Sequence, residues 1–226
     1  MVLPFTVEEF FAVFRAYNDA VWPMQGVLYG LGLAAVALAF FPRTPAADRV
    51  VVGILVVLWA WMGIVYHMLF FAGITPAAWL FGTLFLAQAG LLGWYGLAKW
   101  QLRFGWPGPL RGTMAAVLIA YALLVYPALN AWLGHDLTGG PTFGLPCPTT
   151  IFTIGMLGMV VVPFPRAIWV IPILWSGIGG SAAWLLAVPQ DLGLIAAGIV
   201  ALVFAVWPVN AAQGPSVRPV RGDIAP

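Results

Sequence analysis

Seven apolar segments run along the chain, and short turns rich in proline and glycine separate them. A membrane-spanning helix needs about 20 mainly apolar residues, so the pattern predicts an all-α integral membrane protein with seven transmembrane helices in residues 21–211. The tail, residues 212–226, is polar and proline-rich, and we expect it to be disordered. The predicted spans are residues 21–41, 50–73, 76–98, 112–134, 148–164, 167–188 and 190–210.

A different pattern precedes the first span. Thr6 and Glu9 have the spacing of a capping box, and Phe5 and Phe10 have that of a hydrophobic staple. Apolar and polar positions then alternate with helical spacing. Residues 1–20 are therefore predicted to contain an amphipathic helix that lies in the membrane interface.

Composition supports a membrane protein and argues against several kinds of functional group. Hydrophobic residues make up 63% of the 226 and charged residues only 7%, whereas an ordinary soluble domain carries roughly 25% charged residues. The single cysteine, Cys147, excludes an intrachain disulfide. The predicted spans lack lysine, which excludes a retinal Schiff base, and their cores lack acidic residues, which argues against a buried carboxylate proton relay.

The basic residues predict the orientation. Of the nine, only Arg15 falls on one side of a seven-span arrangement, whereas the other eight fall on the opposite side. Basic residues favour the cytoplasmic side, so the N-terminus is predicted outside and the C-terminus in the cytoplasm. The eight are Arg43, Arg49, Lys99, Arg103, Arg111, Arg166, Arg218 and Arg221.

A faint internal repeat accompanies this topology. Phe41-Pro42-Arg43 recurs as Phe164-Pro165-Arg166, and Leu58-Trp59 recurs as Leu174-Trp175. The order predicts a 3+1+3 arrangement in which spans one to three and five to seven are parallel repeats, as in some transporters. Proline and arginine are also common at turns, so chance is the alternative explanation.

One ionisable side chain, His67, lies well inside a predicted span. Such groups are costly in a membrane and usually functional, although a histidine that only packs against a neighbouring helix is the competing interpretation. Other polar residues are predicted at a similar depth near the outer side. We expect an outward-facing polar site formed by His67, Gln25, Asn130, Thr149, Thr150 and Cys147.

The stretch from Pro141 to Thr150 contains Cys147 between two prolines. Pro148 suits the first position of a helix, which leaves free N–H groups that could receive a ligand. Three interpretations stay open for this stretch: a rigid cap of the fifth span, a ligand site, or a soft-metal site in which Cys147 acts with His67 or His135.

Four stretches together resemble an uncharacterised family of bacterial multi-pass integral membrane proteins. The resemblance implies a bacterial inner-membrane protein and carries no activity with it. The stretches are Val21-Trp22-Pro23, Tyr66-His67 through Pro76, Pro141 to Phe152, and Gly179-Gly180-Ser181 to Leu192.

These features favour a small-solute permease with an outward-facing polar site. The alternatives are a membrane-embedded enzyme or accessory subunit, with His67 as acid or base and Cys147 as nucleophile, and a sensor or assembly protein that docks through its N-terminal helix. We expect the lipid bilayer as a partner, a small molecule or ion as ligand, and no nucleic acid. The sequence leaves the cofactor unknown.

Overall fold

The computed structural model describes residues 4–41, 44–134, 139–186, 188–207 and 209. Arg43, His135 and the predicted tail lie outside this part. The elements, all helical within it, are α1 (Val7–Val21), α2 (Met24–Phe40), α3 (Pro45–Trp61), η1 (Met62–Phe70), η2 (Phe71–Gly73), α4 (Ala77–Leu92), η3 (Gly93–Ala98), α5 (Pro109–Ala120), η4 (Tyr121–Val125), α6 (Tyr126–Trp132), α7 (Pro146–Gly158), α8 (Ala167–Leu185), η5 (Pro189–Asp191) and α9 (Leu192–Val206).

Several helical segments have the length and composition to cross a membrane, as a membrane protein requires. Five do so in the described part of the chain, or six if α1 and α2, which meet at a bend of 87°, count as one broken span. Alone, α2 has 17 residues and α7 has 13. The five are Pro45–Gly73, Ala77–Ala98, Pro109–Trp132, Ala167–Leu185 and Pro189–Val206.

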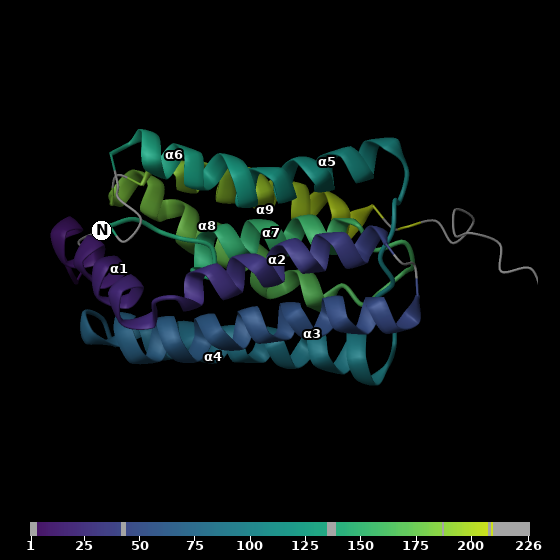
Figure 1. The fold of residues 1–226 in the computed structure, drawn as a ribbon, viewed down its shortest axis with the longest axis horizontal. Coiled ribbons are helices and arrows are strands. Elements are labelled where there is room, and N and C mark those ends of the chain that lie inside the picture. Colours follow the sequence, from purple (N-terminus) through teal and green to yellow (C-terminus); the bar gives the residue numbers. More distant parts are fainter. Residues whose placement is uncertain (1–3, 42–43, 135–138, 187, 208, 210–226) are drawn as a thin grey trace, which may run out of the picture.

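The short helix α7 lies at the centre of the bundle. All its residues are buried except Cys147, which is partly buried. It packs against α5, α8 and α9, and the indole Nε1 of Trp59 on α3 donates a 3.0 Å hydrogen bond to its Thr153 hydroxyl. In Figure 1 the longer helices run alongside α7 in the same general direction. The helix that looked like an ordinary fifth span is therefore the core of the protein.

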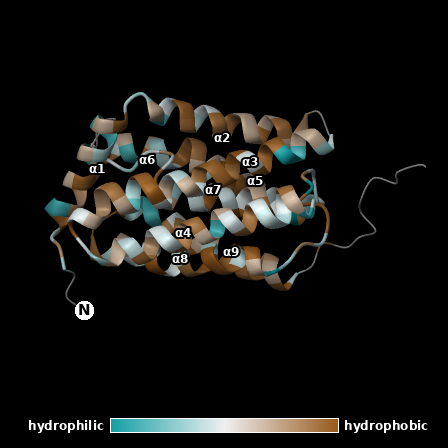
Figure 2. Cartoon of the chain, turned by 90° about the horizontal axis from the view of Figure 1, so that it is seen from below, coloured by the Kyte–Doolittle hydropathy of each residue, from teal (hydrophilic) through white to brown (hydrophobic). Residues whose placement is uncertain are grey.

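Basic residues gather at one end of the bundle, where hydrogen bonds also join the segments that connect the helices. Arg111 donates hydrogen bonds to the carbonyls of Gly158 and Trp207, at the ends of α7 and α9. The connection after η3 pairs with the one after α7 through Gly105 N–H, which donates to Met159 O. Figure 2 shows apolar residues along the helices, with hydrophilic ones mainly near the ends.

The helix α1 lies at the other end and covers the bundle with its aromatic side. The predicted capping box is present, with Thr6 and Glu9 bonded reciprocally, and the rings of Phe5 and Phe10 stack at 6.0 Å. Tyr17 is fully buried and accepts a 2.7 Å hydrogen bond from Trp61 Nε1. The apolar side of α1 therefore packs on η1 of its own chain.

Three of the five helical segments that could cross a membrane contain a π-helical stretch: η1, η3 and η4. η1 carries His67, and η4 is followed by α6, whose second residue is Pro127. Wider turns of this kind are rare and occur often at functional sites. Nothing in the residue pattern indicates them.

The two helix triplets of the predicted repeat pack differently. α7 packs directly against both α8 and α9, whereas α2 packs on α3, and α4 packs on α3 and its continuation η1. Within α8, Ser176 and Gly180 lie at close packing contacts with Gly198 and Ile195 of α9, while a side chain added at Gly177 would meet open space.

Candidate functional site

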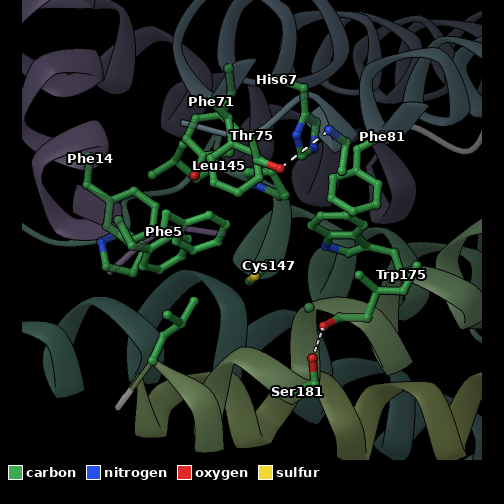
Figure 3. Close-up of a pocket in the computed structure, with 18 of the residues that line it drawn as sticks. Phe5, Phe14, His67, Phe71, Thr75, Phe81, Leu145, Cys147, Trp175 and Ser181 are labelled. Carbon is green, nitrogen blue, oxygen red and sulfur yellow. Dashed lines mark hydrogen bonds between the residues drawn. The ribbon is translucent and has the colours of Figure 1, made fainter. Parts of the chain in front are cut away.

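A cavity of about 310 Å³ opens between α1, η1, α8 and the start of α7. Its walls are mainly aromatic and aliphatic. Figure 3 shows His67, Phe81 and Trp175 on one side, Phe5 and Phe14 on the other, and Cys147 between them. The polar side chains that line it are Tyr66, His67, Thr75, Cys147, Trp175 and Ser181.

His67 is completely buried on the wall of this cavity. Its ring is surrounded by aromatic rings, of which Phe85 at 4.7 Å and Trp175 at 5.2 Å between centroids are examples. Neither His67 nitrogen has a hydrogen-bond partner. The amide and hydroxyl neighbours expected for His67 are replaced by aromatic rings, because η1 presents it to α4 and α8.

Trp175 of α8, on the same wall, is a second ring with a buried, unpaired nitrogen. Its indole Nε1 is buried without a hydrogen-bond partner. The Cys147 thiol lies nearby. Buried polar groups are nearly always paired in folded proteins, so two unpaired ring groups at one cavity mark the strongest candidate site in the described chain.

Cys147 also lies beside Asp191, the second residue of the last predicted span. Asp191 ends η5, is 2% exposed, and accepts a 2.6 Å hydrogen bond from the hydroxyl of Tyr126. The cores of the predicted spans hold no carboxylate, but the fold buries this one at the start of α9. A proline two residues earlier makes the position look like a loop, but the packing of α6 and α8 on η5 encloses it. The acidic side chain beside the Cys147 thiol is thus Asp191. His67, the acid or base in the enzyme hypothesis, is surrounded by aromatic rings instead.

The remaining predicted site residues lie apart from the cavity. Gln25 Nε2 donates a 2.6 Å hydrogen bond to the Asn18 carbonyl. Asn130 accepts a 3.0 Å bond from Gln190 Nε2. Both belong to a polar network that ties α1, α6 and η5 to the segment before α7, and in which Asn18 Nδ2 donates to Gly140 O at 3.0 Å. Sequence reasoning missed Asn18 because it falls on the polar side of α1.

The two threonines lie inside the core. Thr149 is fully buried and accepts a 3.0 Å hydrogen bond from Gly144 N–H through its hydroxyl, which caps the turn before α7. Thr150 is also fully buried, and its hydroxyl has no hydrogen-bond partner. Neither lines the cavity. Of the six predicted residues, the structure brings His67 and Cys147 together there.

A metal centre finds no support in the described residues. No group of three or more histidine, cysteine or acidic side chains could hold an ion there. His135, the second candidate ligand, lies outside that part of the chain.

The helices and the cavity define a class: a protein that is all-helical in its described part, with apolar helices that could span a membrane and a cavity near one end of the bundle. The chain belongs to a family of unknown function, DUF6064, whose model matches residues 7–213. No curated protein and no solved structure matches the chain.

Proposed function

We propose that this protein binds a small, mainly apolar molecule that carries a hydrogen-bond acceptor, in the cavity beside His67. The observation that carries the proposal is the pair of buried, unpartnered ring groups of His67 and Trp175 on one wall. Leaving a buried polar group unpaired costs about 1–3 kcal/mol. A ligand that pairs with these groups would recover that energy.

The lining favours a particular ligand chemistry. The Trp175 indole can only donate, and a neutral His67 ring offers one donor and one acceptor. A carbonyl oxygen can accept from both donors. The aromatic walls suit a flat apolar body, and the volume lies at the small end of the usual range for ligand pockets. A small aryl ketone fits this description.

The proposal includes the membrane arrangement. We infer that the chain crosses a bacterial inner membrane seven times, with the N-terminus and the cavity outside and the C-terminus in the cytoplasm. The concentration of basic residues at the end opposite the cavity supports this orientation. In this arrangement α7 and its flanking segments form the fifth crossing.

Photolabelling tests the binding proposal directly. Benzophenone is itself an aryl ketone and attaches covalently to nearby C–H groups when irradiated. In nanodiscs containing the full chain, it should label peptides from η1 and α8. Acetophenone should reduce this labelling far more than cumene, which has a similar shape but no carbonyl. Equal competition by the two would overturn the acceptor requirement, and labelling confined to lipid-facing helix surfaces would overturn the site.

Two substitutions sharpen the test. His67→Phe and Trp175→Phe remove the ring nitrogens but keep an aromatic side chain. Each should lower the preference for acetophenone over cumene by roughly fivefold, the equivalent of about 1 kcal/mol. Trp184→Phe is the matched control, because Trp184 lies on the same helix but is 76% exposed.

A permease is the second candidate function. The π-helical stretches in three spans favour it, since such irregular turns can accommodate changes in helix geometry. Liposomes bearing the protein should then take up 4-acetylbenzoate, an aryl ketone whose charge keeps it from crossing lipid freely, and His67→Phe should abolish the uptake. Binding without uptake would favour a receptor over a permease.

A further inference from the structure

The carboxyl of Asp191 is a buried ionisable group that the ligand proposal does not use. It stands at the N-cap position of α9, yet its side chain makes no capping hydrogen bond. The side chain instead points into the bundle, where it is 2% exposed. An acidic residue buried among membrane-spanning helices is functional by default, because its charged form is costly there.

The surroundings of Asp191 allow both a charged and a neutral form. Tyr126, itself 1% exposed, donates one 2.6 Å hydrogen bond to the carboxyl. The other titratable groups facing it are Tyr66 on η1, Tyr121 on η4 and Cys147 on α7. The helices α8 and α9 carry no titratable residue.

None of these neighbours is a cation. The side-chain partners of Asp191 in the described structure are Tyr126 and Cys147. A buried carboxylate without a counter-charge depends on hydrogen bonds alone, and protonation removes the cost of the charge. The site therefore has the chemistry to take up and release one proton.

Cys147 joins this carboxyl to the ligand cavity. Its side chain lines the cavity and lies beside both Asp191 and Trp175. A molecule placed against Trp175 and Cys147 changes the polarity next to the carboxyl, and by thermodynamic linkage the proton then changes ligand affinity equally.

We propose that Asp191 is a proton-binding site, and that proton binding there is coupled to occupation of the cavity beside His67. The coupling to the cavity rests on the proposed function, whereas the proton-binding site does not. The reaction is uptake of H⁺ by the carboxylate to form the carboxylic acid, and its release on return. Ligand binding and proton movement would then be two halves of one cycle.

Infrared difference spectroscopy of the full chain tests the proton-binding site without any ligand. As the pH is changed from mildly alkaline to mildly acidic, a C=O stretching band of a buried carboxylic acid should appear. Asp191→Asn should lose this band, while Asp19→Asn, at an exposed position on α1, should keep it. A band that persists in Asp191→Asn, or the absence of any such band in the unmodified protein, overturns the proposal.

Tyr126→Phe covers the case in which Asp191→Asn does not fold. Removing the hydroxyl leaves the carboxyl in place but deletes its hydrogen bond, so the band should shift in frequency; an unshifted band assigns it to another acid and overturns the proposal. Benzophenone labelling measured over the same pH range then tests the coupling. Labelling that varies with pH in the unmodified protein but not in Asp191→Asn supports it. Labelling independent of pH refutes coupling, and absence of labelling refutes the proposed function while the infrared result stands.

Discussion

The hydroxyl of Tyr126 and the carboxyl of Asp191, 65 positions apart in the chain, are joined by a 2.6 Å hydrogen bond inside the helical bundle. This contact links α6 to the start of α9 and leaves the acid with a neutral donor instead of a cation. Hydrogen bonds to charged groups are among the stronger ones in proteins.

Tyr126→Phe should therefore destabilise the protein by about 1–3 kcal/mol, because it leaves a buried carboxyl without its donor. Thermal unfolding in detergent measures the change. Tyr95→Phe, on η3 near the basic end, is the matched control and should change stability much less. Equal effects of the two substitutions would show that the Tyr126 hydroxyl has no special role.

Asn18→Ala should loosen α1. The Asn18 side chain is fully buried, donates to the Gly140 carbonyl and accepts from the Thr142 hydroxyl, so its loss leaves both partners unpaired, at a cost of about 1–3 kcal/mol. Hydrogen–deuterium exchange should rise in α1 more than in α7. Asp19→Ala, at the exposed neighbouring position, should leave the exchange pattern unchanged. If both variants raise exchange equally, the bridge does not hold α1.

Gly63→Ala should destabilise the contact between η1 and α4. A Cβ at Gly63 would lie 2.9 Å from the backbone carbonyl oxygen of Gly82, which cannot move without shifting the helix. Overpacking of this kind costs about 1–3 kcal/mol. Gly53→Ala, in α3, meets no atom within 4 Å and should be neutral or stabilising by up to about 1 kcal/mol. Reversed stabilities in urea unfolding would contradict the close approach.

Cys147 should react from outside the cell with a membrane-impermeant thiol reagent, because it lines a cavity that we assign to the outer side. As the only cysteine it gives a specific signal, and Cys147→Ala provides the blank. Acetophenone should slow the reaction and cumene should not. Labelling only after the cells are permeabilised would reverse the orientation.

Reporter fusions test the same orientation along the chain. Fusions after Trp106 and after Pro226 should report cytoplasm, and a fusion after Gly140 should report outside. The expectation follows from the eight basic residues on one side of the seven-span arrangement. A cytoplasmic signal after Gly140 would contradict seven crossings.

Local signals along the chain predicted local structure well. Thr6 and Glu9 predicted the start of α1, because a capping box depends on neighbours three residues apart. Apolar runs bounded by proline predicted a span over 50–73, and the helical segment Pro45–Gly73 covers it. The same runs could not distinguish a lipid-facing helix from α7, because both are apolar throughout.

The site depends on contacts between distant residues and was predicted only in part. His67 was found because an ionisable residue stands out in an apolar run. Trp175 was not, since tryptophan is ordinary in a membrane protein and only the missing partner of its Nε1 singles it out. Asn130 and Gln25 were assigned to a ligand site because they are polar, but they bond to other parts of the chain instead.

The enclosed position of α7 bears on how this protein is made. The helix is about 20 Å long, shorter than the roughly 30 Å of a bilayer's hydrocarbon layer, and it keeps almost no surface for lipid. Two of the helices that surround it, α8 and α9, follow it in the chain and leave the ribosome later. When α7 is synthesised, two of the helices that will surround it in the folded protein have therefore not yet been made. In the proposed membrane arrangement, we expect its final insertion to wait for the C-terminal third of the chain, so that assembly is a concerted event rather than a succession of independent crossings.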